Sequence, residues 1–166
     1  MKIFLIGYRG SGKSTVAQLL SEKYQIPFYS LDQMIVEHEN MSINEIVKQN
    51  NWDYFRKIES MILEKVISND NAIIDCGGGI IEKEENRKRL SNEKNVFFLK
   101  ASVNIIKQRI NSATDRPALT DKDFLTEIEE VYKRRIPLYS EVAHYIINAD
   151  DIPSKIVEEI SLFLEK

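Results

Sequence analysis

The sequence contains a single cysteine, Cys76, among its 166 residues. One cysteine excludes an intrachain disulfide, and such scarcity is typical of a protein in a reducing compartment. We therefore expect a cytoplasmic protein. Because a chain of this length buries a large share of its surface on folding, its core can hold the fold together without a disulfide or a structural metal.

Long apolar runs and a surplus of basic residues are also missing. No stretch approaches the roughly 20 apolar residues that a membrane-spanning helix requires. Lysine and arginine number 23 against 26 acidic residues, for a formal net charge of -3 at pH 7. Nucleic-acid binders usually carry a basic surplus. The sequence thus predicts no membrane segment and no nucleic-acid partner, while leaving room for a local basic pocket that binds an anion.

Glycine is scarce as well, and all six glycines fall in two clusters, 7–12 and 77–79. Each cluster directly follows a short apolar run, Ile3–Ile6 or Ala72–Ile74, of the kind that forms a strand buried on both faces. In parallel sheets, ligands bind beyond the carboxyl ends of the strands. We therefore expect both glycine clusters at one ligand-binding edge of a sheet.

Strand-like and helix-like segments alternate along the chain. Apolar runs predict five strands, at 3–6, 28–29, 72–74, 96–99 and 145–147. Helices are expected at 13–24, in three pieces between 31 and 69, at 82–90, 102–110 and 124–135, and from Pro153 onward. This alternation predicts an α/β fold, a five-stranded parallel sheet flanked by helices, with residues 1–166 forming a single domain.

The first glycine cluster matches the phosphate-binding motif G-x-x-x-x-G-K-[ST] at every fixed position, from Gly7 to Ser14. Glycines let the backbone N–H groups of such a loop point at phosphate oxygens, and the next helix adds the positive end of its dipole. Lys13, expected to be exposed, supplies charge for the outer phosphates, and Ser14 offers a hydroxyl to Mg²⁺. The expected ATP site comprises Gly10, Ser11, Gly12, Lys13, Ser14 and Thr15, together with Arg109, Arg116 and Pro153.

The phosphate loop alone does not choose between kinases, GTPases and ATPases. GTPases usually carry an N-K-x-D segment that specifies guanine, and none occurs in this sequence. Small-molecule and nucleotide kinases are therefore the leading group, because function depends on the site rather than on the fold.

Further motifs follow the phosphate loop in order: Ile26–Asp32, Phe55-Arg56 with Glu59, Gly77–Gly79, Arg116-Pro117 and Arg135–Tyr139. Together they resemble the shikimate kinase family in order and spacing over nearly the whole chain. The resemblance implies a P-loop kinase that transfers the γ-phosphoryl group of ATP to the 3-hydroxyl of shikimate, with Mg²⁺. It also implies a mobile lid, which matches about 111–122 here.

The resemblance implies a role for each matching residue. Asp32 would contact the acceptor hydroxyls, and Arg56 and Arg135 would hold the shikimate carboxylate. Gly77, Gly78 and Gly79 would let the backbone approach the shikimate ring, and Arg116 in the lid would meet the transferring phosphate. Lys13, Asp32 and Arg116 would be the catalytic residues. The chemistry agrees, because guanidinium matches carboxylate with two parallel hydrogen bonds and a hydroxyl nucleophile needs a nearby carboxylate.

Each of these residues also has a plainer interpretation. Arg56 could form a surface ion pair with Glu59 at i, i+3. Arg135 could belong to a solvated cluster with Lys133 and Arg134, and Arg116 could be an ordinary loop charge. Asp32 could serve only the start of a helix, and the glycine triplet could be a turn. Trp52 is expected to anchor helix packing.

The family usually has two aspartates, D-x-D, after the second strand. This sequence has Ser30 at the first place and Asp32 at the second. The first aspartate is normally linked to Mg²⁺ through water, and serine cannot supply its charge. Asp75, at the end of the third strand, is the candidate replacement and has the position of a Walker B aspartate. Its plainer interpretation is a cap for the following glycine turn.

Two rival functions remain open. One is a related kinase that acts on another hydroxy acid, such as a gluconate-type substrate. The other is a nucleotide-binding regulatory module with weak or no transfer, a possibility raised by Ser30. The expected partners are ATP and a small-molecule acid, and the expected oligomeric state is a monomer.

Overall fold

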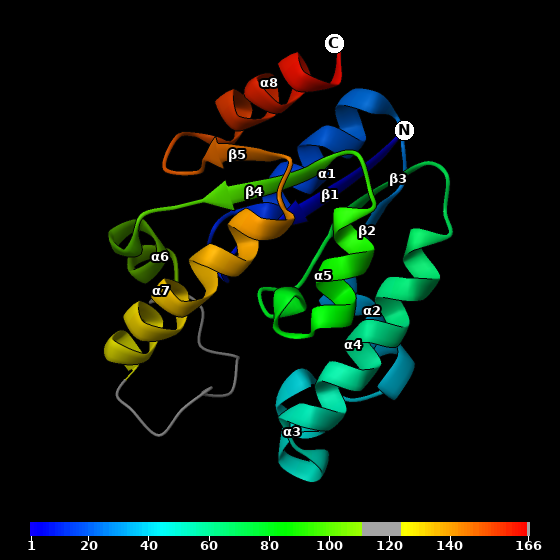
Figure 1. The fold of residues 1–166 in the computed structure, drawn as a ribbon, viewed down its shortest axis with the longest axis vertical. Helices are drawn as coiled ribbons and strands as arrows, with labels where there is room; N and C mark the ends of the chain where they lie inside the picture. Colours follow the sequence, from blue (N-terminus) through cyan, green and yellow to red (C-terminus); the bar gives the residue numbers. More distant parts are fainter. Residues whose placement is uncertain (111–123, 166) are drawn as a thin grey trace.

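The computed structural model describes residues 1–110 and 124–165. These residues form a five-stranded, wholly parallel sheet with helices on both faces, as predicted (Figure 1). The predicted lid at 111–122, with Arg116, lies outside the described residues. In the described part of the chain, no helix is both long enough and apolar enough to cross a membrane.

The strand order is β2-β3-β1-β4-β5. The strands are β1 (Lys2–Ile6), β2 (Phe28–Ser30), β3 (Ala72–Asp75), β4 (Val96–Lys100) and β5 (Tyr145–Asn148). The order places β1 between β3 and β4, and all three are buried along most of their length. Leu5 pairs with Asp75, so the loops after β1 and β3 leave the sheet side by side. Both glycine clusters therefore lie at one edge, as expected for a parallel sheet.

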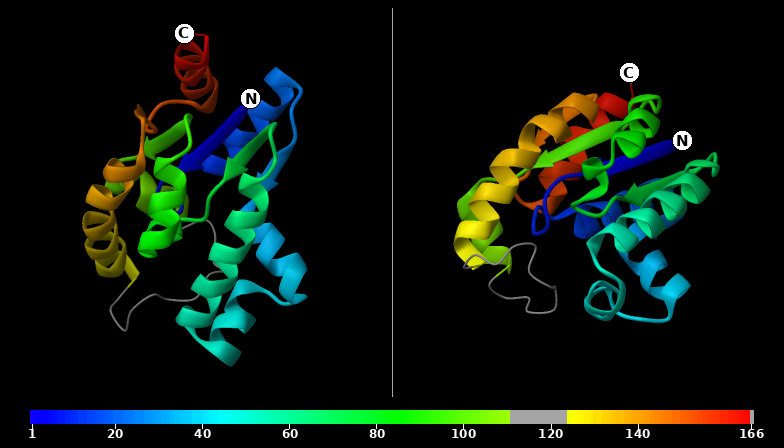
Figure 2. Two further views of the ribbon diagram at one scale, coloured as in Figure 1. Left: turned by 45° about the vertical axis from the view of Figure 1, so that its right-hand side comes forward. Right: turned by 60° about the horizontal axis from the view of Figure 1, so that its bottom comes forward.

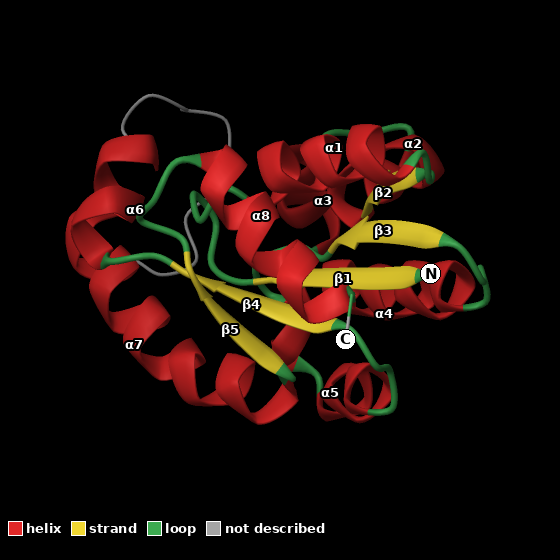
Figure 3. Ribbon diagram, turned by 90° about the horizontal axis from the view of Figure 1, so that it is seen from above, coloured by secondary structure: helices red, strands yellow, loops and turns green. Residues whose placement is uncertain are grey.

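The helices form two layers and a projecting group. They are α1 (Lys13–Tyr24), α2 (Leu31–Glu39), α3 (Ile43–Asn50), α4 (Trp52–Ile67), the 3-10 turn η1 (Ile80–Glu82), α5 (Glu84–Ser91), α6 (Val103–Ile110), α7 (Phe124–Val142) and α8 (Pro153–Leu164). Helices α1 and α8 pack together on one face, and α5 and α7 cover the other (Figures 2 and 3). A capping box formed by Ser42 and Glu45 begins α3.

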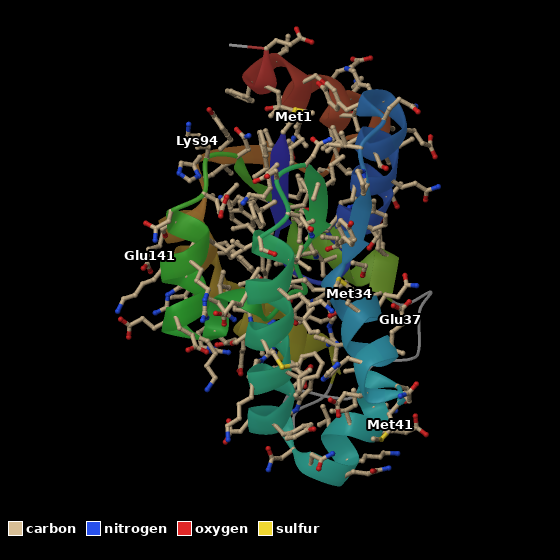
Figure 4. All side chains as sticks on the ribbon, turned by 90° about the vertical axis from the view of Figure 1, so that its right-hand side faces the viewer. Met1, Met34, Glu37, Met41, Lys94 and Glu141 are labelled. Atoms are coloured by element: carbon tan, nitrogen blue, oxygen red, sulfur yellow. The ribbon has the colours of Figure 1, made fainter. Side chains whose placement is uncertain are left out.

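Helices α2, α3 and α4 pack on one another and extend beyond the end of the sheet (Figures 1 and 4). Met34 of α2 and Met41, just after it, are partly buried against the core, whereas Glu37 is exposed on the outer side of α2 (Figure 4). This group and the phosphate loop lie on either side of the glycine triplet. The α2–α4 group therefore forms the outer wall of the site described below.

Two helix predictions were wrong in their bounds. The segment predicted as a helix from 82 to 90 begins as the 3-10 turn η1 and becomes helical only from Glu84. The last turns of α7 were missed, because Pro137 lacks the N–H that a helix needs and predicts a break. The helix continues through Pro137 to Val142. Tyr139 is fully buried there and stacks on Phe98 with ring centroids 4.9 Å apart, and this packing offsets the missing hydrogen bond.

Candidate active site

The phosphate loop connects β1 to α1 and depends on its glycines. Gly7, Gly10 and Gly12 have φ angles of 145°, 78° and 93°, which side chains of L-residues rarely allow. A Cβ at Gly7 would also lie 2.7 Å from the carbonyl oxygen of Leu99. The loop path is therefore available only to glycine at these places, which explains the motif in structural terms.

Lys13 lies folded over the loop rather than exposed. Its Nζ donates hydrogen bonds to the carbonyl oxygens of Gly7 and Tyr8, at 2.9 Å and 3.0 Å, and the residue is 7% exposed. The expectation of an exposed lysine was wrong, because the loop curls so tightly that its own carbonyls surround the ammonium group. Ser11 is fully buried, and its Oγ has no hydrogen-bond partner among the described residues.

Ser14 contacts Asp75 at the start of α1, and Ser30 lies next to Asp75 on the neighbouring strand. Ser14 Oγ donates a 2.5 Å hydrogen bond to Asp75 Oδ2. Ser30 is the register partner of Asp75 on the neighbouring strand β2, and its Oγ accepts from the backbone N–H of Gln33 at 3.4 Å, capping α2. Position 30 lacks a carboxylate, but Asp75 provides one on the neighbouring strand, where it contacts the Ser14 hydroxyl.

This donor set fits Mg²⁺ bound with a nucleotide. The part of the chain that the structure describes contains no cluster of three or more His, Cys, Asp or Glu side chains that could hold a metal alone. Magnesium in nucleotide sites commonly takes one or two carboxylates, with phosphate oxygens and waters completing its shell. Asp75 and Ser14 provide one carboxylate and one hydroxyl, which matches that requirement.

A pocket lies on the other side of the glycine triplet from the phosphate loop, next to helices α2–α4. Its lining residues are Arg9, Asp32, Ile43, Trp52, Phe55, Arg56, Glu59, Gly78, Gly79 and Arg135. The structure therefore brings together Asp32, Arg56, Arg135 and two of the three triplet glycines, as the sequence predicted. Arg9, Trp52 and Glu59 were missed as site residues, although Glu59 stands at ion-pair spacing from Arg56.

Arg56 and Glu59 form a buried pair. Arg56 Nη1 donates to the two carboxylate oxygens of Glu59, at 2.9 Å and 2.8 Å. The sequence predicted this pairing, but the interpretation of it as a surface pair was wrong, because Glu59 is only 1% exposed. Burial raises the pKa of Glu59 to about 7, although the adjacent Arg56 charge acts in the opposite direction. The nearby carboxylate of Asp32 raises that pKa further.

Aromatic rings and a glycine hold the Arg56 guanidinium in place. Its Cζ lies 5.3 Å from the ring centroid of Trp52 and 5.2 Å from that of Phe55, within the range of cation–π attraction. A Cβ at Gly79 would fall 2.1 Å from Arg56 Nη2, so a glycine there leaves the guanidinium its space. Trp52 thus does more than anchor helices, since it also lines the pocket.

The other two glycines of the triplet make room for different neighbours. A Cβ at Gly77 would lie 2.7 Å from Asp32 Oδ1, and one at Gly78 would lie 3.0 Å from the backbone nitrogen of Arg9. Gly78 therefore packs against the phosphate loop, whereas Gly77 admits the carboxylate of Asp32. Gly78 and Gly79 do form a turn, as the plainer interpretation expected, and this turn also brings the loop and the acceptor-side residues close together.

Arg135 is buried at the centre of α7, with 4% exposure. Its Nε donates to Glu82 Oε1 at 2.7 Å and its Nη1 to the carbonyl oxygen of Gly78 at 3.3 Å. The guanidinium carbon lies 5.7 Å from the ring centroid of Tyr8. The solvated-cluster interpretation is therefore wrong for Arg135, while the side chain of its neighbour Arg134 is 59% exposed.

Arg109 joins the phosphate loop to the segment after β5. Its Nη1 donates to the carbonyl oxygen of Gly10 at 3.3 Å, and its Nη2 to that of Ala149 at 3.1 Å. Pro153 follows as the first residue of α8, and Thr15 is exposed in the first turn of α1. Arg109 is thus placed at the phosphate loop, and its predicted contact with ATP stays a prediction.

Comparison with known proteins agrees with this geometry. A family model described as shikimate kinase matches residues 9–165. The chain belongs to the shikimate kinase family. Shikimate kinase 2 of Photorhabdus laumondii subsp. laumondii is 41% identical over 157 residues, which cover 93% of this chain and 90% of that protein. Shikimate kinase 2 of Escherichia coli O7:K1 is 40% identical over 161 residues, covering 95% and 92%.

Solved shikimate kinases share the fold over almost their full length. The enzyme from Acinetobacter baumannii, solved in complex with shikimate, gives a TM-score of 0.90 at 29% identity and covers 99% of this chain and 90% of its own. The Bacteroides thetaiotaomicron enzyme gives a TM-score of 0.92 at 28% identity and covers 100% of this chain and 99% of its own. A gluconokinase from Sinorhizobium meliloti gives only 0.58 at 19% identity, which indicates a shared fold alone.

Proposed function

We propose that this chain is a shikimate kinase, which transfers the γ-phosphoryl group of ATP to the 3-hydroxyl of shikimate. One observation carries the proposal. Two buried arginines and a carboxylate, Arg56, Arg135 and Asp32, line a pocket that shares its Gly78 wall with a phosphate loop. A site for an anionic, hydroxyl-bearing acceptor thus adjoins a site for ATP.

The two arginines bind the acceptor carboxylate in this proposal. Guanidinium groups suit carboxylates because they offer paired N–H donors and stay charged when buried. Both arginines already have a carboxylate partner, Glu59 for Arg56 and Glu82 for Arg135, so each enters the pocket with its orientation fixed. Preorganised donors of this kind bind an anion without much loss of side-chain entropy.

Asp32 orients the attacking hydroxyl and accepts its proton. The acceptor oxygen forms a bond to the γ-phosphorus, the bond from that phosphorus to the β–γ bridging oxygen breaks, and ADP leaves with the bonding electrons. The transition state gains from positive charge at the transferring group, which Lys13 supplies from the loop. We also assign to Arg116 the role that the family resemblance gives it, that of a lid arginine that meets the same phosphate.

Mg²⁺ would be held through Ser14 and Asp75. When bound, this ion neutralises charge on the β- and γ-phosphates. Asp75 supplies the negative charge that the usual aspartate at position 30 would bring, and its hydrogen bond to Ser14 keeps both groups together at the start of α1. Arg109 and Pro153 would border the remainder of the nucleotide.

We also propose that the chain works as a monomer, with ATP and the small-molecule acid as its partners. The scarcity of cysteine supports a cytoplasmic location for the reaction.

An ADP-release assay with ATP and Mg²⁺ tests the proposal against a panel of shikimate, quinate, gluconate and nucleoside monophosphates. We expect shikimate to give the highest kcat/KM. Preference for gluconate or a nucleoside monophosphate would contradict the assigned substrate. Nucleotide binding without turnover of any acceptor would instead support a regulatory module.

A further inference from the structure

Glu82 links the glycine triplet to α7. It ends η1, directly after Gly79, Ile80 and Ile81. Its Oε1 accepts from Arg135 Nε at 2.7 Å and from Arg134 Nη2 at 2.7 Å, and its Oε2 accepts from Arg134 Nη1 at 3.0 Å. One carboxylate thus holds two consecutive arginines, the inner one lining the acceptor pocket and the outer one facing solvent.

The environment keeps this carboxylate ionised. Partial burial by itself would raise the pKa of Glu82, but the hydrogen bonds and charges of Arg134 and Arg135 outweigh that effect and lower it. The side chain of Glu82 is 20% exposed and that of Arg135 only 5%. The Glu82–Arg135 contact is therefore a charge-assisted hydrogen bond in a largely buried place, where such bonds are strong.

The geometry of this contact decides which nitrogens Arg135 can offer. A guanidinium group is planar, so a partner that holds Nε also fixes the plane of the group and the direction of its two terminal nitrogens. Nη1 contacts the carbonyl oxygen of Gly78, on the wall of the acceptor pocket. With Nε occupied by Glu82, the terminal nitrogens are the part of Arg135 left to meet a substrate.

We propose that Glu82 is a positioning residue for the acceptor acid, which fixes the Arg135 guanidinium so that its terminal nitrogens bind the substrate carboxylate. The inference rests on the proposed function and extends it to a residue that does not touch substrate. Arg134 contributes by holding the same carboxylate from the solvent side.

Simple electrostatics makes the opposite prediction, which renders the inference testable. Glu82 brings a negative charge close to an anion-binding site, so its removal should tighten acid binding if only the net charge mattered. If its role is positioning, removal lets the Arg135 side chain rotate and weakens acid binding. The sign of the change in KM for shikimate therefore separates the two.

The test measures kcat and both KM values for Glu82→Ala and Glu82→Gln. We expect Glu82→Ala to raise KM for shikimate about tenfold, because misplacement of a positioning group by about 1 Å can cost as much as about 100-fold, while KM for ATP changes less than about twofold. Glu82→Gln keeps an oxygen that can accept from Arg135 Nε and should recover most of the loss. An unchanged or lower KM for shikimate in Glu82→Ala would overturn the proposal.

A double-mutant cycle separates positioning from a general loss of structure. In an Arg135→Ala background, Glu82→Ala should add almost nothing to the KM for shikimate, because its effect passes through Arg135. Additive effects would overturn the inference. Glu84→Ala is the matched control. Glu84 lies two residues after Glu82, and its exposed carboxylate pairs with Lys88 and not with Arg135. If the unsubstituted protein does not phosphorylate shikimate, the proposed function fails; if it does and the Glu82 variants behave normally, only this inference fails.

Discussion

In the proposed function, Lys13 serves both the phosphate loop and the reaction. Its ammonium group binds two loop carbonyls, so Lys13→Ala should lower both activity and, slightly, the stability of the loop. We expect kcat to fall about 100-fold or more, by analogy with removal of a single preorganised charge-stabilising donor. A steady-state assay with thermal unfolding as a fold check measures this.

Lys23→Ala is the control for Lys13→Ala, since Lys23 lies at the far end of the same helix and binds Ser161. Its turnover should be normal. A Lys13→Ala protein with near-normal turnover would contradict the phosphate-loop assignment.

Asp75 and Ser30 form a second pair that can be tested at the residue scale. Asp75→Asn keeps the size and most hydrogen bonding but removes the charge next to Ser14. We expect about tenfold more Mg²⁺ to be needed for half-maximal rate, within the range that loss of a metal-supporting group usually costs. A Mg²⁺ titration of the rate checks this.

Ser30→Asp should partly rescue Asp75→Asn, because Ser30 and Asp75 are register partners on adjacent strands. An unchanged magnesium requirement in Asp75→Asn would reduce Asp75 to a cap of the glycine turn.

Glu59 predicts a pH dependence of stability. Its pKa is raised to about 7 from 4.5, so the folded protein holds the Glu59 proton more tightly than the unfolded chain does. The resulting stabilisation is complete below the unfolded pKa and is lost as pH rises through the folded one. As the pH rises from about 4.5 to 7, the free energy of unfolding of the unsubstituted protein should therefore fall relative to that of the Glu59→Gln variant. Urea unfolding of both proteins at several pH values measures the difference, and parallel curves would contradict it.

At the scale of elements, the glycine triplet joins two half-sites, and its members should have different phenotypes. A Cβ at Gly79 meets the Arg56 guanidinium, the movable end of a side chain, whereas a Cβ at Gly78 meets the backbone nitrogen of Arg9. Gly79→Ala should therefore raise KM for shikimate and spare ATP. Gly78→Ala should raise KM for ATP, because the phosphate loop has to shift. Kinetics of both variants, each the control of the other, test the assignment, and identical profiles would contradict it.

Helix α7 shows where element bounds escape sequence reasoning. Pro137 carries the correct local signal for a helix end, yet burial of Tyr139 against Phe98 keeps the chain helical. The extra turns of α7 also affect the site. They place Arg135 in the middle of a helix, where its side chain is held by Glu82 and by Gly78 rather than by solvent.

At the scale of the whole molecule, the proposed function places the two substrates on opposite sides of the triplet. The nucleotide would bind over the loop after β1, and the acceptor would bind in the pocket against the α2–α4 group. Phosphoryl transfer requires exclusion of water from between them, which the family assigns to a lid.

We predict from the sequence that segment 111–122 gains protection from hydrogen exchange when an ATP analogue binds. Shikimate alone should leave this segment unchanged, and equal protection with and without nucleotide would count against a lid.

The sequence by itself determined the alternation of strands and helices, the phosphate loop and the family. The strands, helices and phosphate loop depend on local rules, since apolar runs and positive-φ glycines act within a few residues, whereas the family follows from the order of motifs along the chain. It also identified Arg56, Arg135, Asp32 and Asp75 as the side chains to examine.

Only the tertiary structure decided which neighbours those side chains have. The pairing of β2 with β3 sets Ser30 beside Asp75, and the path of η1 sets Glu82 on Arg135. Burial turned the expected surface pair of Arg56 and Glu59 into a pair whose carboxyl pKa is about 7. These contacts join residues distant in the chain or depend on removal of water, and neither is encoded in local spacing.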